Sequence, residues 1–337
     1  MMGIAGWALL FVASAAVVIR SGLALSKAGD LLAEQTGLGR LWVGTIFLAV
    51  ATSLPELVTN LSAVRLDAPA LAGGNVLGAN MLNIVVLAAL VSLFPAVAVR
   101  RMGRDQVWLV ATALALTGVV TALVALGGPG DLGPISLGTV VILGGYVAGM
   151  TAVYRTRGRE PDGSAGEVDG HSEGKPPLLR RAWFRFGLAA AGVLVAAPFL
   201  AASADRLADL LGISGSFMGV LAVALVTTMP ETSVTFGALR LGSGEMALGN
   251  VYGSCAFNVG ILALADLVYP RPIFHALDRS HVVAGLGALL LMALGPGFLY
   301  LRTRKRLRAS QALAVGIVGI WIGVMFVVFS RAPGSLP

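Results

Sequence analysis

The chain has 337 residues, of which 57% are hydrophobic and only 12% are charged, and its mean hydropathy is +0.86. Such a composition excludes a soluble globular protein and indicates a polytopic membrane protein. The formal net charge is +7, and the single cysteine, Cys255, excludes an internal disulfide and offers no thiolate cluster for zinc or iron–sulfur chemistry.

Long apolar runs recur along the whole chain. A helix needs about 20 residues to cross a hydrocarbon layer about 30 Å thick, and ten runs are long enough. They cover residues 5–27, 41–64, 70–97, 106–127, 133–154, 183–203, 216–239, 246–269, 280–301 and 310–330. The first run is too long for a cleaved signal peptide, so we expect it to be a retained helix.

The basic residues are distributed unevenly between the two sides of this arrangement. Loops that follow odd-numbered spans carry 17 Lys and Arg, against 5 on the opposite side. Because positively charged loops stay in the cytoplasm, we expect both termini to lie outside the cytoplasmic (inner) membrane. Orientation thus explains the positive charge, and we expect the lipid bilayer and inorganic cations, but no nucleic acid, as partners.

A polar stretch divides the chain into two halves with five predicted spans each. The first half covers residues 1–154 and the second 183–337, and the stretch between them, 155–182, is predicted to be a flexible cytoplasmic linker. Since five is odd, two homologous halves must cross the membrane in opposite directions. The predicted fold is therefore an all-α membrane protein with ten transmembrane helices arranged as two inverted five-helix repeats.

The two halves share a sequence motif. Thr-Ser-Leu-Pro-Glu at 52–56 is followed by Gly-Asn-Val-Leu-Gly-Ala-Asn-Met-Leu-Asn at 74–83, and Thr-Thr-Met-Pro-Glu at 227–231 by Gly-Asn-Val-Tyr-Gly-Ser-Cys-Ala-Phe-Asn at 249–258. Without a gap, 14 of 41 positions are identical between 43–83 and 218–258. Each copy places a glutamate, Glu56 or Glu231, inside an apolar run, where an ionisable group is expensive and usually functional.

Polar side chains accompany each glutamate at helical spacing. One face carries Thr52, Ser53 and Glu56 in the first copy, and Thr227, Thr228 and Glu231 in the second. The proline before each glutamate cannot donate a backbone hydrogen bond, which frees a carbonyl oxygen that a cation could use. The following element of each copy adds a second polar stripe, which includes Asn83 in the first half and Ser254 and Asn258 in the second.

These groups are hard oxygen ligands, which favour calcium or sodium over zinc or copper. Two ionised glutamates would balance one divalent cation. Monovalent ions or protons could balance them equally well, and that interchange is the physical basis of an antiporter.

The doubled motif resembles the alpha-repeats of the calcium/cation antiporter family, which includes sodium/calcium exchangers. The resemblance implies a transporter rather than an enzyme, with transported ions in place of cofactors, and we expect a monomer. It implies that Glu56 and Glu231 are the principal calcium ligands, with backbone oxygens from Thr52 and Thr227. The implied sodium ligands are Ser53, Thr228, Ser254 and the carbonyls of Ala49 and Ala224, and Asn83 and Asn258 complete the centre. The first and sixth helices would slide to alternate access.

The chain departs from the family pattern at three positions, one of which is Asn258, where many members carry Asp and others Asn. Where the family usually has Gly-Ser-Asn, this chain has Ala79 in the first repeat and Cys255 in place of Asn in the second.

The leading hypothesis is export of Ca²⁺ in exchange for Na⁺. The alternatives are a Ca²⁺/H⁺ antiporter and a passive cation channel, while an intramembrane hydrolase lacks a recognisable nucleophile and base.

Overall fold

The computed structural model describes residues 3–94, 102–128, 130–132, 135–156, 176–211 and 228–330. Within these ranges, nine helices are long and apolar enough to span a membrane. They correspond to nine of the ten predicted spans. The remaining one, 216–239, is described only from Thr228 onward, and its earlier part lies outside the described residues.

The described elements divide between the two halves of the chain. The first half contains α1 (Ile4–Thr36), α2 (Arg40–Trp42), the π-helical η1 (Val43–Leu48), α3 (Ala49–Arg65), α4 (Pro69–Leu93), α5 (Arg104–Ala125), the two-residue strands β1 (Asp131–Leu132) and β2 (Ile135–Ser136), which pair antiparallel, and α6 (Leu137–Thr156). The second half contains α7 (Pro176–Leu210), α9 (Met229–Arg240), α10 (Gly244–Val268), the 3-10 turn η2 (Ile273–Ala276), α11 (Arg279–Thr303) and α12 (Leu307–Ser330).

Several helices are longer than the apolar runs that predict them. The run 5–27 becomes α1, which has 33 residues, and 183–203 becomes α7, which has 35. Because α6 ends at Thr156 and α7 begins at Pro176, both ends of the predicted linker 155–182 are helical. Hydropathy marks only the part of a helix that can lie in hydrocarbon, whereas the backbone hydrogen bonds continue into polar turns.

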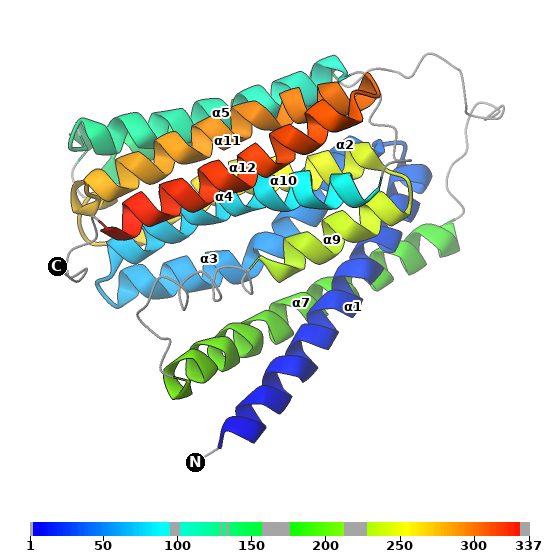
Figure 1. Ribbon diagram of the computed structural model, residues 1–337, viewed down its shortest axis with the longest axis horizontal. Coiled ribbons are helices and arrows are strands. Elements are labelled where there is room, and N and C mark those ends of the chain that lie inside the picture. The colour runs from blue at the N-terminus through cyan, green and yellow to red at the C-terminus, as the bar shows by residue number, and fades with distance from the viewer. Residues whose placement is uncertain are drawn as a thin grey trace.

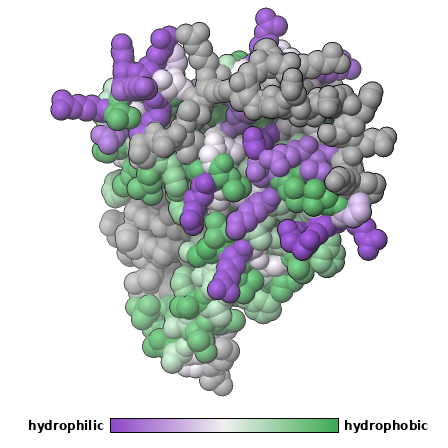
Figure 2. All heavy atoms as spheres, turned by 90° about the vertical axis from the view of Figure 1, so that its right-hand side faces the viewer, coloured by the Kyte–Doolittle hydropathy of each residue, from purple (hydrophilic) through white to green (hydrophobic). Residues whose placement is uncertain are grey.

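Burial separates the central helices from the outer ones. In α10, 78% of the most apolar window is buried inside the molecule, against 22% in α1 and 17% in α12. Figure 1 shows α1 and α7 side by side on one flank, with α5, α11 and α12 on the other. Figure 2 looks onto the right-hand end of Figure 1 and shows hydrophilic side chains over the upper and middle parts of that face, with mostly hydrophobic ones below them. The outer helices therefore present the apolar surface expected to face lipid.

The segment from α2 through the π-helical η1 packs closely against α10. A Cβ atom added to Gly249 would lie 2.5 Å from the carbonyl oxygen of Leu41, and one added to Gly253 would lie 2.5 Å from that of Thr45. Only glycine allows two backbones to approach this closely. The helix α3 follows η1 directly and continues through Pro55.

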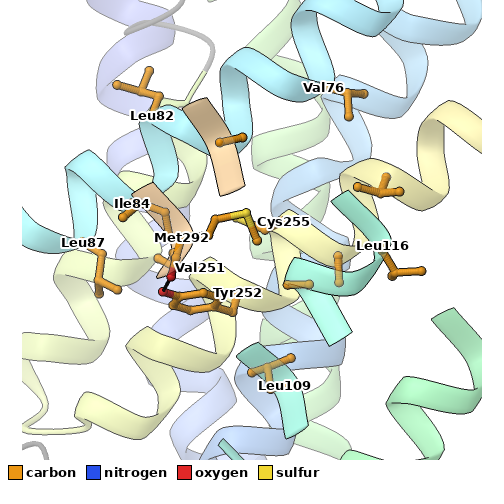
Figure 3. Close-up of a cluster of buried hydrophobic side chains, with 14 of the residues drawn as sticks. Val76, Leu82, Ile84, Leu87, Leu109, Leu116, Val251, Tyr252, Cys255 and Met292 are labelled. Carbon is orange, nitrogen blue, oxygen red and sulfur yellow. Dashed lines mark hydrogen bonds between the residues drawn. The ribbon is translucent and has the colours of Figure 1, made fainter. Parts of the chain in front are cut away.

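A cluster of buried side chains surrounds the middle of α10 (Figure 3). It includes Tyr252 and Cys255 from α10 and Met292 from α11, and the Tyr252 hydroxyl donates a 2.8 Å hydrogen bond to the Met292 carbonyl. A buried hydroxyl needs such a partner. This packing fixes α10 against α11.

A buried carboxylate also anchors the far end of α10. Asp266 accepts hydrogen bonds from the Thr139 hydroxyl at 2.6 Å, from the backbone N–H of Ser136 at 3.0 Å and from that of Ile273 at 2.5 Å. These three donors belong to α6, β2 and η2, so Asp266 ties three connecting elements to the central helix.

Candidate ion-binding site

The acidic motifs of the two halves meet inside the molecule. Glu56 lies on α3 and Glu231 in the first turn of α9, and both are buried, with 6% and 2% of their surface exposed. The Ser53 hydroxyl donates a 3.3 Å hydrogen bond to Oε1 of Glu231. Because Ser53 and Glu56 share a face of α3, this bond brings the first motif to the carboxylate of the second.

Equivalent positions of α4 and α10 also face each other. The Asn80 side-chain amide donates to the Cys255 carbonyl at 3.1 Å, and the Cys255 thiol donates to the Asn80 carbonyl at 3.8 Å. These two residues are 175 positions apart, the offset between the motifs. A reciprocal contact between equivalent residues is what a pseudo-twofold axis between two repeats produces.

Several buried oxygen atoms here have no hydrogen-bond partner within the described residues. They are Oε2 of Glu56, Oε2 of Glu231, Oδ1 of Asn83, Oδ1 of Asn258 and Oγ of Ser254. Leaving a buried polar atom unpaired typically costs about 1–3 kcal/mol, and more for a charged group. Such oxygens, which come from both halves, are suited to bind a hard cation.

Amide side chains support the backbone of both glutamates. Asn60 donates to the Glu56 carbonyl at 2.7 Å, while Asn250 donates to the Glu231 carbonyl at 3.3 Å and to the Thr235 hydroxyl at 3.0 Å. Sequence reasoning did not select Asn60, Thr235 or Asn250 as site residues. Asn60 and Thr235 occupy equivalent positions of the two repeats, and both are polar. An alignment of the repeats could therefore have identified them.

Asn80 is a further residue that the sequence analysis did not select. It is fully buried, and its side-chain oxygen accepts a 3.1 Å hydrogen bond from the Asn258 amide. This bond orients Asn258, which the sequence predicts to be a site residue. Asn80 therefore belongs to the shell that positions the site.

Nine of the eleven predicted site residues lie in the described part of the chain, and all nine are buried: Ala49, Thr52, Ser53, Glu56, Asn83, Thr228, Glu231, Ser254 and Asn258. The other two, Ala224 and Thr227, lie outside the described residues. The Thr52 hydroxyl donates to the Ala49 carbonyl at 3.1 Å. Both of these predicted ligands thus face the same turn of α3.

The chain matches one protein family over nearly its whole length. Its sequence matches the family described as "Sodium/calcium exchanger protein" over residues 6–154 and 181–330. It is 24% identical over 320 residues to the inner membrane protein YrbG of Escherichia coli, and the aligned region covers 94% of this chain and 96% of that protein. It is 33% identical over 118 residues to the sodium/calcium exchanger MaX1 of Methanosarcina acetivorans, and this aligned region covers 34% of each chain.

A solved structure has the same fold. The sodium-calcium exchanger NCX_Mj, soaked with 10 mM Na⁺ and zero Ca²⁺, superimposes with a TM-score of 0.71 at 22% identity, over 94% of this chain and 99% of that one. The predicted fold class, an all-α membrane protein in two inverted five-helix repeats, is confirmed, and nine of its ten predicted spans are helical within the described ranges. With the family match over both halves and the two carboxylate motifs in contact, the chain belongs to the sodium/calcium exchanger family and is a transporter rather than an enzyme.

Proposed function

We propose that this protein exports Ca²⁺ across the cytoplasmic membrane in exchange for Na⁺, by alternating access. The observation that carries the proposal is the hydrogen bond from Ser53 to Glu231, which joins the motifs of the two halves in a region where five oxygen atoms lack partners among the described residues. A pair of buried carboxylates is costly unless cations neutralise it. One Ca²⁺ or several Na⁺ ions would satisfy the same oxygens, and this competition is the basis of exchange.

The residues have distinct roles in this proposal. Glu56 and Glu231 are the principal calcium ligands, each with a buried oxygen available, and the backbone oxygens of Thr52 and Thr227 assist them. The sodium ligands are Ser53, Thr228, Ser254 and the carbonyls of Ala49 and Ala224, and Asn83 and Asn258 complete the centre. The transported ions are the only small ligands that this function requires.

Alternating access needs a moving element beside a fixed site. The helices α1 and α7 lie together on the flank of the bundle (Figure 1), and α1 also packs along α9, which carries Glu231. Movement of this pair across α3 and α9 would open the site to one side and then the other. The halves 1–154 and 183–337 act as the two repeats, with both termini outside and the linker 155–182 in the cytoplasm.

Proton coupling is the second candidate, and one observation favours it. Ser254 contributes a buried hydroxyl in the second repeat, whereas the equivalent position in the first repeat is Ala79, which has no ligand atom in its side chain. Loss of a hydroxyl weakens one potential sodium position. Two glutamates that each take up a proton could release Ca²⁺ without dedicated sodium ligands.

Ion-resolved flux distinguishes the two candidates. The full chain is reconstituted in liposomes that hold ⁴⁵Ca²⁺ at a lower concentration than the surrounding buffer. Efflux is measured under an imposed Na⁺ gradient at equal pH, and then under an imposed pH gradient without Na⁺. We expect the Na⁺ gradient to drive Ca²⁺ uphill. Uphill flux driven only by the pH gradient would support the proton-coupled candidate, and flux that neither gradient drives uphill would indicate a channel.

A further inference from the structure

A groove between α1 and α7 lies on the flank of the bundle, outside the ion-binding site. Its volume is about 460 Å³, and its lining includes three basic side chains, Arg20, Lys27 and Arg185, beside apolar residues such as Leu31 and Leu188. Sites that bind small ligands have volumes of roughly 300–1,000 Å³. The groove is therefore large enough for a ligand, and the proposed ion exchange makes no use of it.

The positive charges of the groove have no partner in the described chain. Lys27 lies two helical turns after Arg20 on the same face of α1, and Arg185 approaches from α7. No carboxylate whose side chain the structure describes lies within ion-pair distance of any of the three side chains. Asp30, a nearby acid of α1, is paired with Arg40 at 2.6 Å.

These basic side chains lie on a surface that is otherwise apolar. Ile19 beside Arg20 is 42% exposed, and Phe184 and Leu188 on either side of Arg185 are 70% and 65% exposed. Cationic groups near hydrocarbon are expensive unless they are paired. A partner from outside the chain must therefore be both anionic and compatible with lipid.

We propose that this groove binds the phosphate headgroup of an anionic glycerophospholipid, with its acyl chains along the apolar surface of α7. Guanidinium groups bind phosphate oxygens in a bidentate manner, and lysine adds a compact positive charge. Basic pockets between transmembrane helices are suited to such headgroups. Exposed apolar side chains such as Phe184 and Leu188 would contact the acyl chains, which free phosphate lacks.

The lipid would bridge two helices, because its ligands come from both α1 and α7. The two helices are in direct contact next to the groove, where Ser21 packs against Gly192 without room for a Cβ atom at the glycine. A headgroup held by Arg20, Lys27 and Arg185 would add an ionic link to this contact. The inference concerns lipid binding and holds whichever ion drives Ca²⁺ exchange.

The test measures lipid binding to the purified full chain. Delipidated protein is titrated with phosphatidylglycerol or phosphatidylcholine in detergent, and bound lipid is counted by native mass spectrometry. We expect preferential binding of phosphatidylglycerol, and a loss of affinity of roughly tenfold or more in the variant R20Q/K27Q/R185Q. The matched control K305Q/R306Q/R308Q removes three exposed basic residues from the turn between α11 and α12 and from the start of α12, and we expect it to bind as the wild type does.

Three outcomes would overturn the proposal: equal binding of the two lipids, an equal loss in the control variant, or displacement of phosphatidylglycerol by millimolar inorganic phosphate, which would identify a free-anion site. A second measurement uses only the wild-type protein and so does not depend on the folding of a variant. Photoactivatable phosphatidylglycerol in 1:3 phosphatidylglycerol–phosphatidylcholine vesicles should label peptides of α1 and α7 around the groove. Labelling confined to other helices would contradict the proposal.

Discussion

The Ser53 hydroxyl donates a hydrogen bond to Oε1 of Glu231 across 3.3 Å, and the two residues are 178 positions apart in the chain. Ser53 belongs to the Thr-Ser-Leu-Pro-Glu motif of the first half and Glu231 to the Thr-Thr-Met-Pro-Glu motif of the second. Both side chains are buried. The bond therefore fixes the position of one half's carboxylate by a side chain of the other half.

Removal of this hydroxyl should weaken ion binding more than it weakens folding. In Ser53→Ala, Glu231 loses a donor and the site loses a proposed sodium ligand, so we expect Na⁺-driven Ca²⁺ flux to fall roughly tenfold. The control is Ser62→Ala on the same helix, where the hydroxyl bonds only to the Val58 carbonyl of its own exposed turn. Equal flux in the two variants would show that the Ser53 bond has no role in transport.

The two glutamates should each be necessary for exchange. In Glu56→Gln and in Glu231→Gln, a buried charge is removed while the volume of the side chain is kept, and we expect flux to fall by roughly 100-fold or more. Wild-type protein should also gain thermal stability from added Ca²⁺, because a ligand that binds only the folded state stabilises it. Each variant should remain folded but lose this gain.

A matched acidic control is available on α1. Glu34 is an exposed residue that pairs with Arg40 at 3.3 Å, and exposed ion pairs contribute little to stability. We expect Glu34→Gln to retain both Ca²⁺ flux and the stabilisation by Ca²⁺. Retained flux in either site variant would rule out the assigned calcium ligands.

The close approach of η1 and α10 should depend on glycine. In Gly253→Ala the new methyl group would meet the Thr45 backbone at 2.5 Å, and we expect a loss of about 1–3 kcal/mol of unfolding free energy. Gly260 lies on the same helix with no atom within 4 Å of an added Cβ, so Gly260→Ala should be neutral or slightly stabilising. Thermal unfolding of the two variants in one detergent compares them, and similar melting temperatures would contradict the packing described here.

Asp266 should matter for stability and not for transport. Asp266→Ala leaves three buried donors without an acceptor, at about 1–3 kcal/mol for each group left unpaired. We expect a lower melting temperature and an unchanged Ca²⁺ flux per folded molecule. Thr139→Ala removes only one of the three bonds and should destabilise less. A selective loss of flux in Asp266→Ala, at unchanged stability, would place this carboxylate in the ion path.

The start of α11 should respond to acid through Asp278. Burial raises the pKa of this carboxyl, but hydrogen bonds from Ser280 and His281 outweigh burial and lower the pKa from 3.8 to about 2. Because the folded pKa lies below the unfolded one, Asp278 stabilises the fold above pH about 4, and this stabilisation is lost as the pH falls toward 2. The melting temperature should therefore fall more between pH 5 and pH 2.5 in the wild type than in Asp278→Asn. An equal fall in the two proteins would exclude this contribution.

The sequence predicted the helices well because their apolar runs have the length that a membrane requires. It was less accurate at their ends: α1 continues past residue 27 through Lys27, Asp30 and Glu34 to Thr36, since hydropathy does not register polar turns that remain helical. The residues of the two motifs were found because the same positions recur at a constant offset. The sequence did not predict Asn80 as a site residue. Its equivalent in the second repeat is Cys255, so comparing the two repeats does not reveal the hydrogen bond between Asn80 and Asn258.

The sequence by itself determined that the chain spans a membrane, that it is duplicated in inverted halves, and that each half contributes one intramembrane glutamate. Only the tertiary structure decided that Ser53 reaches Glu231, that Asn80 lies opposite Cys255, and that three basic residues line one groove between α1 and α7. The physical reason is that lipid-facing and protein-facing surfaces of a transmembrane helix are equally apolar. Periodicity therefore reveals that a helix exists, whereas its partners depend on how distant helices pack.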